Sequence, residues 1–573
     1  METTINNPPR VVILGLDGGC LGLLKNWADQ GLLPNFQEFL EKGVSGPLTS
    51  IIPPITAAAW TSFMTGKNPG KHGLYDFMEP SRASYEMRFT NARSRRSISI
   101  WQMLNDAGLQ VGVFNVPMTF PPDPVDGFMI SGMDTPLATS DFIHPPALRQ
   151  ELERVFGKVV IEPRHLGFIK TDQQRAQLLE EIKAQETQRT DMFFYLLAKH
   201  PVDVAMLVYR ATDIVQHFFW HYQDQSHYWH KKMSDHPFAS AILEVYQHLD
   251  QELGRVLKTL PAGTTYLIMS DHGFGGTGKA WFHPNSLLRQ KGYLTLKPDQ
   301  KKWGGVFWNS LFSYADQFLR SRLTPEQKSR LAHYLPGLRR RFEDSASGYS
   351  LIDWPHTKAF ANETSALVPG IWINLKGRFP EGIVEPGPEY QALVANLKAE
   401  LTSLRWDGRP LIAGVYHKDE VYSGPYLDQA PDLILNWWQE ASYVCKASFA
   451  GGKESPVVEN DPGYSPTRSE WSGTHRLDGL VLLKSPYFRQ GVALEKSHIL
   501  DLAPTILYLL GLPVPEDFDG QVLREAFAAD FLEAHPLVSQ KGSEEIRPLQ
   551  EQTYTEEEAE TISAKLKELG YLD

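Results

Sequence analysis

The chain has 573 residues, of which 42% are hydrophobic and 22% charged, with a formal net charge of -12 and a pI of about 5.9. These fractions are typical of a folded globular protein, and the length fits either several domains or one large α/β unit with insertions. The acidic balance argues against general binding to DNA or RNA, whose phosphates require a basic surface. The two cysteines, Cys20 and Cys445, are too few for a disulfide framework or a cysteine-ligated zinc site, so a reducing compartment fits.

The sequence shows neither a signal peptide nor a membrane-spanning segment. The opening METTINNPPR lacks a basic region followed by a long apolar run. No uninterrupted apolar stretch approaches the roughly 18 residues that a transmembrane helix needs. We therefore expect a cytoplasmic protein with no membrane partner.

The predicted elements alternate between strand and helix along the chain. The aliphatic run at 10–19 stops at Asp17 and a glycine pair, as a buried parallel strand does. Amphipathic helices are predicted at 21–31, 33–43, 98–108 and 239–260, and strands at 109–117, 200–210 and 264–276. This alternation predicts an α/β fold with a doubly wound, mostly parallel central sheet and helices on both faces. Such sheets bind ligands at the carboxyl ends of their strands.

The composition changes at residues 290–350, which are rich in Lys, Arg and aromatic residues and predict a helical insertion or cap. The core would then be discontinuous, with segments 1–289 and 351–530. Residues 531–573 form a predicted C-terminal tail. The tail ends in an amphipathic helix that is acidic early and Lys-bearing late, as the helix dipole favours.

Four groups of polar side chains stand out at these strand ends and loops. One group is the Asp and His of TDIVQH, which have i, i+4 spacing and so share one helix face. Another is the adjacent Asp and His of the glycine-rich turn SDHGFGG, where a pair of coordinating side chains has little structural purpose. The full set is Asp17, Asp213, His217, Asp271, His272 and His475.

Aspartate and histidine are the ligands expected of a zinc or similar transition-metal site, and this set could hold two ions. Three of the four groups have a plainer explanation when taken alone. Asp17 could cap a loop, Asp213 and His217 could face solvent or cap a helix, and His475 could be a structural or solvated histidine. The set and its order along the chain favour metal binding.

The stretch PPITAAAWTSFMTGKNPGKHG, residues 53–73, places a single threonine before a slim apolar helix. Thr56 could simply cap that helix. It could instead be a reactive hydroxyl held at the positive end of the helix, where a phosphoryl oxyanion is also favoured.

Together with LGLDGG, TDIVQHFFW, SDHGFGG, GTHRLDG and HILDLAPTILYLLGLPVPEDFDG, this stretch resembles the type I phosphodiesterase/nucleotide pyrophosphatase family of the alkaline phosphatase superfamily. The resemblance implies an alkaline-phosphatase-like fold and two metal sites. It makes Thr56 the nucleophile and His72 part of a turn. One metal would take Asp17, Thr56, Asp271 and His272, and the other Asp213, His217 and His475.

The resemblance implies a metal-dependent hydrolase of phosphodiester or pyrophosphate bonds, acting on a small phosphoester or nucleotide-type substrate. Thr56 would form a covalent phospho-threonine while two metal ions clamp the phosphoryl group. Zinc is the expected metal and manganese the alternative. The family pattern is expected to place a phosphoryl-binding asparagine at position 59. This chain has Ala59, so the donor must come from elsewhere, such as the Ala57 amide or the cap.

Three other functions fit the sequence less well. A phosphoglycerate-mutase-like phosphotransferase of the same superfamily would use serine and manganese, and Thr56 argues against it. A sulfatase would need a Cys/Ser-x-Pro-x-Arg motif, which the sequence lacks. A non-catalytic metal-binding protein is disfavoured because every ligand position holds a competent residue.

Overall fold

The computed structural model describes residues 5–163, 169–230, 236–298, 349–363, 370–439, 443–449, 454–465, 471–542, 554–569 and 571–572. Its largest element is a nine-stranded sheet with the order β22-β2-β21-β9-β1-β8-β5-β6-β7. In that order the strands span Val492–Ala493, Val44–Thr49, Asp478–Lys484, Thr265–Met269, Val11–Leu16, Val204–Tyr209, Val111–Val116, Gly127–Ser131 and Ile143–His144. Among the described residues, no helix combines the length and apolar character needed to cross a bilayer.

The centre of this sheet is parallel. Strand β1 pairs in parallel with β8 and β9, and β5 pairs in parallel with β8 and β6. Antiparallel neighbours come nearer the edges, where β21 lies between β2 and β9 and where β7 pairs with β6. The predicted doubly wound, mostly parallel sheet is therefore confirmed.

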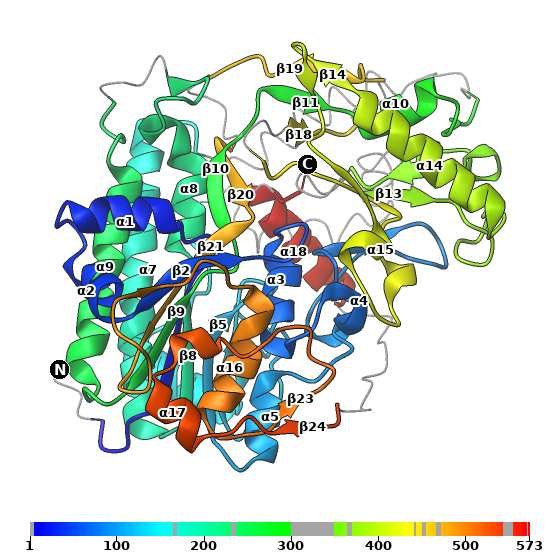
Figure 1. Cartoon of the computed structure of the whole chain (residues 1–573). Helices are drawn as coiled ribbons and strands as arrows, with labels where there is room; N and C mark the ends of the chain where they lie inside the picture. The colour runs from blue at the N-terminus through cyan, green and yellow to red at the C-terminus, as the bar shows by residue number, and fades with distance from the viewer. Residues whose placement is uncertain are drawn as a thin grey trace.

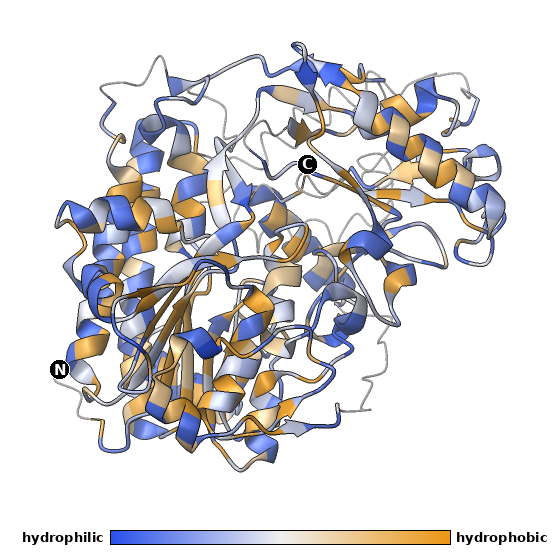
Figure 2. Cartoon of the chain, viewed as in Figure 1, coloured by the Kyte–Doolittle hydropathy of each residue, from blue (hydrophilic) through white to orange (hydrophobic). Residues whose placement is uncertain are grey.

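The sheet is buried on both faces, because alternate residues of β1 enter two apolar clusters. Leu14 belongs to the first and Ile13 to the second. The first cluster includes helices α1 (Leu21–Asp29), α2 (Pro34–Lys42), α6 (Ala147–Phe156), α7 (Asp172–Lys199), α8 (Ala211–Gln223) and α9 (Ala241–Thr259). The second includes α3 (Thr56–Thr65), α5 (Ile100–Asp106), α16 (Leu502–Leu509) and α17 (Ala529–Ala534). Figure 1 shows α7 and α9 on one side of the sheet and α3 and α16 on the other, and Figure 2 shows the strands between them as the most apolar part of the molecule.

Smaller sheets stand apart from the central one. Strands β12 (Ala359–Ala361), β13 (Gly370–Ile373), β17 (Leu433–Leu435) and β16 (Val415–His417) form an antiparallel sheet. With α14 (Pro388–Ser403) it lies at the upper right of Figure 1. A three-stranded sheet joins β18 (Tyr443–Cys445), β11 (Ala280–Phe282) and β19 (Val458–Asn460). A two-stranded ribbon pairs β10 (Gly273–Gly276) with β20 (Gly473–Arg476).

The predicted insertion at 290–350 falls largely on residues 299–348, which lie outside the described residues. The boundaries of the core and of the tail at 531–573 stay predictions. Within the segment 351–530, the chain builds the four-stranded sheet before it returns to the central sheet at β21. In the tail, helix α18 spans Glu556–Glu568 and is capped by Thr555, whose side chain accepts a hydrogen bond from the backbone N–H of Glu558.

Candidate active site

The predicted polar residues meet at the carboxyl edge of three adjacent parallel strands. Asp17 follows β1, Asp271 follows β9, and Asp213 lies in the first turn of α8, which follows β8. Because β9, β1 and β8 are neighbours in the sheet, their ends lie together. The antiparallel pairing of β10 with β20 places Phe274 opposite His475 and so brings the most distant histidine to the same edge.

One group of ligand atoms forms around Asp213. Its Oδ1 lies 3.1 Å from His217 Nε2 and 3.4 Å from His475 Nε2. The Nδ1 atoms of these rings lie 2.9 Å from the carbonyl oxygens of Gly473 and Pro54. A ring that donates from Nδ1 to a carbonyl keeps Nε2 free to bind a metal, which is how ligating histidines are usually held.

A second group forms around His272. Its Nε2 lies 3.3 Å from Asp271 Oδ2, 3.6 Å from Asp17 Oδ1 and 3.3 Å from Thr56 Oγ1. Its Nδ1 lies 3.1 Å from the Gly273 carbonyl oxygen. Ligand atoms of Asp17, Asp213 and His272 all lie within 4.8 Å of one another, as do those of Asp213, His217 and His475. Asp213 thus reaches both groups, whereas the resemblance assigned it to one.

In the part of the chain that the structure describes, the aspartates of both groups have too few hydrogen-bond donors around them. Asp17, Asp213 and Asp271 are at most 1% exposed. Among the described residues, no hydrogen-bond donor serves either oxygen of Asp17, Asp213 Oδ1 or Asp271 Oδ2. An unpaired buried charge is strongly unfavourable. Orphaned carboxylate oxygens beside free imidazole nitrogens match the donor set of a divalent metal ion, so these residues fit the predicted metal sites.

The pKa values of Asp17 and Asp271 also reflect a shortage of positive charge around these residues. Burial, followed by repulsion from Asp271, raises the pKa of Asp17 well above its usual value. Burial and repulsion from Asp213 likewise raise the pKa of Asp271. Burial lowers the pKa of His217 to about 4, so the ring is neutral at neutral pH, as a metal ligand must be. Burial would also raise the pKa of Asp213, but neighbours including His217 and Arg210 hold it well below its usual value.

Thr56 does not cap its helix. It is the first residue of α3, and Ile55 occupies the capping position without a side-chain hydrogen bond. The fully buried Oγ1 of Thr56 instead faces His272 Nε2 and the hydroxyl of Tyr571, each at 3.3 Å. The capping interpretation of this threonine is therefore wrong.

The expectation that position 59 faces the phosphoryl group is also wrong. Ala59 is fully buried in the second apolar cluster, together with Trp60 and Phe63. Position 59 is thus part of the core beneath the sheet rather than of the polar site. His72 takes the structural role predicted for it, because its Nε2 lies 2.9 Å from Ser62 Oγ and its Nδ1 accepts the backbone N–H of Leu74.

Two residues of the site escaped the sequence analysis. Arg210 is fully buried, and its Nη2 donates to Asp213 Oδ2 at 2.8 Å while its Nε lies 3.2 Å from Asp17 Oδ2. Its position three residues before Asp213, at helical spacing, was an available signal. Tyr571 approaches both Thr56 and Asp213 from the C-terminal tail, and no local pattern pointed to it.

A model of the type I phosphodiesterase / nucleotide pyrophosphatase family matches residues 11–479. The chain belongs to this family. It is therefore an enzyme of the phosphodiesterase/nucleotide pyrophosphatase type, and its central sheet is the alkaline-phosphatase-like sheet of the family.

Individual relatives are distant. No curated protein matches the chain in sequence. Human ectonucleotide pyrophosphatase/phosphodiesterase 5 is 13% identical with a TM-score of 0.42, and the match covers 92% of this chain and 99% of that one. Phosphonoacetate hydrolase from Sinorhizobium meliloti, solved with phosphonoformate, is 15% identical with a TM-score of 0.44, and the match covers 88% and 97% of the two chains.

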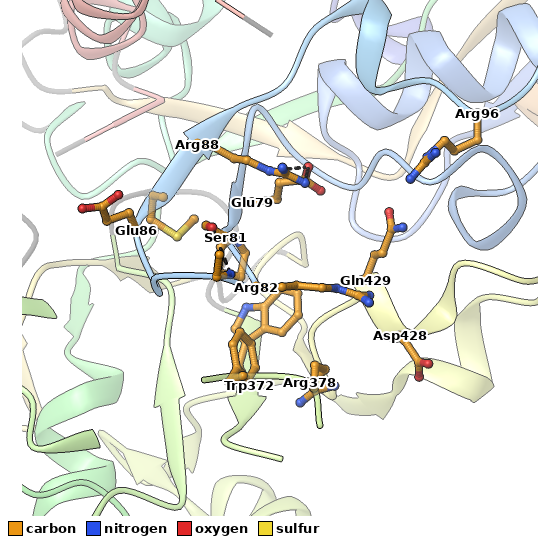
Figure 3. A pocket seen from close by; sticks show the side chains of 14 residues that line it. Glu79, Ser81, Arg82, Glu86, Arg88, Arg96, Trp372, Arg378, Asp428 and Gln429 are labelled. Atoms are coloured by element: carbon orange, nitrogen blue, oxygen red, sulfur yellow. Dashed lines mark hydrogen bonds and ion pairs between the residues drawn. The ribbon is translucent and has the colours of Figure 1, made fainter. Parts of the chain in front are cut away.

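A separate cavity of about 450 Å³ lies between the hairpin of β3 (Met78–Pro80) and β4 (Met87–Phe89) and the four-stranded sheet. None of the predicted site residues lines it. Figure 3 shows Arg82 extending beside Trp372, and Arg88 paired with Glu79. Arg378 also lines this cavity and is paired with buried Asp432. At least two of its arginines are therefore matched by acidic residues of the protein.

Proposed function

We propose that this family member hydrolyses phosphodiester or pyrophosphate bonds of a small phosphoester or nucleotide-type substrate, with Thr56 as the nucleophile. The observation that carries the proposal is the place of Thr56 Oγ1, which is buried at the start of α3 and 3.3 Å from His272 Nε2. The unpaired N–H groups at a helix start favour the negative charge of a phosphoryl group.

Two divalent ions complete the proposed site. Asp213, His217 and His475 would hold one, and Asp17, Thr56, Asp271 and His272 the other, with Asp213 in reach of both. The mixed carboxylate and imidazole donors suit zinc, with manganese as the alternative. Such ions supply the positive charge that stabilises an ionised threonine oxygen and the charge that develops on the phosphoryl oxygens.

The protein residues divide the remaining work between them. Thr56 Oγ1 gives up its proton to water and forms a bond to phosphorus as the bond to the leaving oxygen breaks, which gives a phospho-threonine. Attack of water on phosphorus then breaks the bond to Oγ1 and restores the hydroxyl. Arg210 holds Asp213 Oδ2 at 2.8 Å throughout and offsets part of the negative charge around it.

The test is a substrate panel on metal-loaded protein, with p-nitrophenyl phosphate, bis-p-nitrophenyl phosphate and p-nitrophenyl thymidine monophosphate. We expect Thr56→Ala to lose turnover by roughly a thousandfold or more, since the nucleophile is gone. It should keep its metal, because the carboxylate and imidazole ligands are intact. Thr56→Ser should retain part of the activity, because a hydroxyl remains.

Thr61→Ala is the matched control. Thr61 lies on the same helix and is also buried, but its hydroxyl donates to the Ala57 carbonyl oxygen. The Thr61→Ala enzyme should therefore keep a turnover near that of the parent. Rapid acid quench and peptide mass analysis should find phosphate on Thr56, and a fully active Thr56→Ala enzyme would end the proposal.

A further inference from the structure

The C-terminal segment of the chain enters the candidate active site. The hydroxyl of Tyr571 lies 3.3 Å from Thr56 Oγ1 and 3.4 Å from Asp213 Oδ2. Its side chain is buried, and 515 residues separate it from Thr56 in sequence. A residue from the far end of the chain thus contacts both the proposed nucleophile and the aspartate that reaches both metal groups.

The Tyr571 ring is held on several sides by other aromatic rings. Its centroid lies 4.9 Å from that of Phe77 and 5.3 Å from that of Trp471, which meets it nearly edge-on. Trp471 in turn stacks on His217, with 3.4 Å between ring centroids. Contacts of this kind orient the ring, so its one polar atom is aimed at Thr56 rather than free to rotate away.

The tail that carries Tyr571 is packed against the core. Helix α18 buries Ile562 and Leu566 in the first apolar cluster. Lys565 Nζ donates to the Thr135 carbonyl oxygen at 3.2 Å, and the Tyr554 hydroxyl donates to the Asp134 carbonyl oxygen at 2.9 Å. Figure 1 shows α18 in red near the centre of the molecule, with the C-terminus beyond it. The segment is therefore built into the site rather than lying loosely over it.

The Tyr571 hydroxyl makes two long contacts, with Thr56 Oγ1 and Asp213 Oδ2. A phenol hydroxyl can both donate and accept a hydrogen bond. Asp213 Oδ2 already accepts from Arg210 at 2.8 Å, and the two contacts of the Tyr571 hydroxyl are both longer. In the structure the Tyr571 hydroxyl donates to Asp213 Oδ2 at 3.4 Å, and this long bond can be exchanged for one to an oxygen that arrives in front of Thr56. A hydroxyl at this place can supply a hydrogen bond where negative charge develops on a phosphoryl oxygen.

We propose that Tyr571 is a further catalytic residue, whose hydroxyl orients Thr56 Oγ1 and donates a hydrogen bond to a phosphoryl oxygen as the bond from Thr56 to phosphorus forms. The proton stays on Tyr571 throughout, so no bond of the phenol breaks. The inference rests on the proposed role of Thr56 as nucleophile.

The test uses the metal-loaded full chain with bis-p-nitrophenyl phosphate. Tyr571→Phe removes only the hydroxyl and keeps the ring in its aromatic surroundings. Loss of one donor to a developing oxyanion lowers kcat by about 100-fold or more in well-studied cases. We expect kcat to fall at least tenfold, while KM and metal content stay within about threefold of the parent. The rate at which phosphate appears on Thr56 should fall by the same factor as kcat.

Leu572→Ala is the control for packing of the tail, because Leu572 is the next buried side chain in the segment. It should leave kcat within about twofold. An unchanged kcat in Tyr571→Phe would overturn the inference. So would a Tyr571→Ala enzyme faster than the parent, since the segment would then be a plug over the site.

The two proposals fail in different ways. Phosphate trapped on Thr56 together with an unaffected Tyr571→Phe enzyme overturns only the role of Tyr571. An active Thr56→Ala enzyme with no trapped phosphate overturns the nucleophile and this inference with it.

Discussion

The negative charge of Asp432 and that of the aspartates in the candidate active site are balanced in different ways. Directly before strand β17 of the four-stranded sheet, Asp432 is fully buried and has several partners. Arg378 Nη1 lies 3.0 Å and Lys418 Nζ 3.3 Å from its Oδ1, and the Tyr390 hydroxyl donates to the same oxygen at 2.8 Å. Burial alone would raise the pKa of Asp432, but Arg378 and Lys418 hold it below its usual value.

At the edge of the central sheet, by contrast, Asp17 and Asp213 pair with the same buried cation, Arg210, which also faces Glu162. Asp271 has no ion pair with a Lys or Arg among the described residues. Several of their oxygens have no donor among the described residues, and the pKa values of Asp17 and Asp271 are raised. This difference in charge pairing distinguishes an acid with a structural role from acids that fit a metal site. A buried acid that is paired with cations of the protein stabilises the fold. A group of buried acids with too few such cations is instead suited to binding metal ions.

The largest predicted effect is a loss of activity, and it concerns the aspartates of the candidate active site. Asp213→Ala should remove the carboxylate that reaches both metal groups, so we expect both bound ions to be lost or weakened and turnover to fall by roughly a thousandfold or more. Asp271→Ala, which touches only the second group, should mainly affect one ion. Metal analysis beside turnover measures both.

Asp106 is exposed, so Asp106→Ala is a control for the removal of a negative charge. It should leave both metal content and turnover unchanged. A chelator should abolish activity in the parent, and zinc or manganese should restore it. If Asp213→Ala keeps its metal and stays within a few-fold of the parent, the ligand role of Asp213 is wrong.

The next largest effect is on stability and concerns Asp432. Asp432→Asn leaves Arg378 and Lys418 as buried cations without their main counter-charge, which should lower the free energy of unfolding by about 3–5 kcal/mol. The loss should be the same with and without metal. Urea denaturation measures it.

Asp428→Asn is the matched control, because Asp428 also approaches Lys418, at 3.9 Å, but its side chain is 81% exposed. Pairs of that kind contribute about 0–1 kcal/mol. Equal stability losses in the two variants would show that the internal pairing of Asp432 carries no special weight.

The smallest effect comes from a buried acid between these two cases. Glu363 accepts hydrogen bonds from the backbone N–H groups of Asn285 and Ser448, each at 2.7 Å, and burial raises its pKa to about 7. A carboxyl whose pKa is raised by folding binds its proton more tightly in the folded state. Its contribution to stability is present below the unfolded value of about 4.5 and is lost as the pH rises through about 7.

Glu363→Gln cannot ionise and so lacks this pH dependence. The difference in Tm between the parent and Glu363→Gln should therefore shift against the parent between pH 5.5 and pH 8. Differential scanning calorimetry of metal-loaded protein at both values measures it. A difference that stays constant across this range would mean that Glu363 titrates normally.

Much of the site could be read from short stretches of sequence. Helical spacing put Asp213 and His217 on one face, and the ends of aliphatic strands marked Asp17 and Asp271. These signals are local, because they depend on the 3.6-residue turn of a helix and on where a buried strand must stop. The alternation of strands and helices likewise predicted the central sheet and helices on both of its faces.

Other features depended on which remote segments pack together, and local patterns carry no such information. The order of β9, β1 and β8 in the sheet decided that the aspartates meet, and the pairing of β10 with β20 brought His475 to them. Sequence alone left Thr56 between cap and nucleophile, and the packed structure turned its oxygen toward His272. Tyr571 joins the site from the opposite end of the chain. Such contacts arise because burying apolar surface of the tail and of both sheet faces at once brings together residues that are remote in sequence.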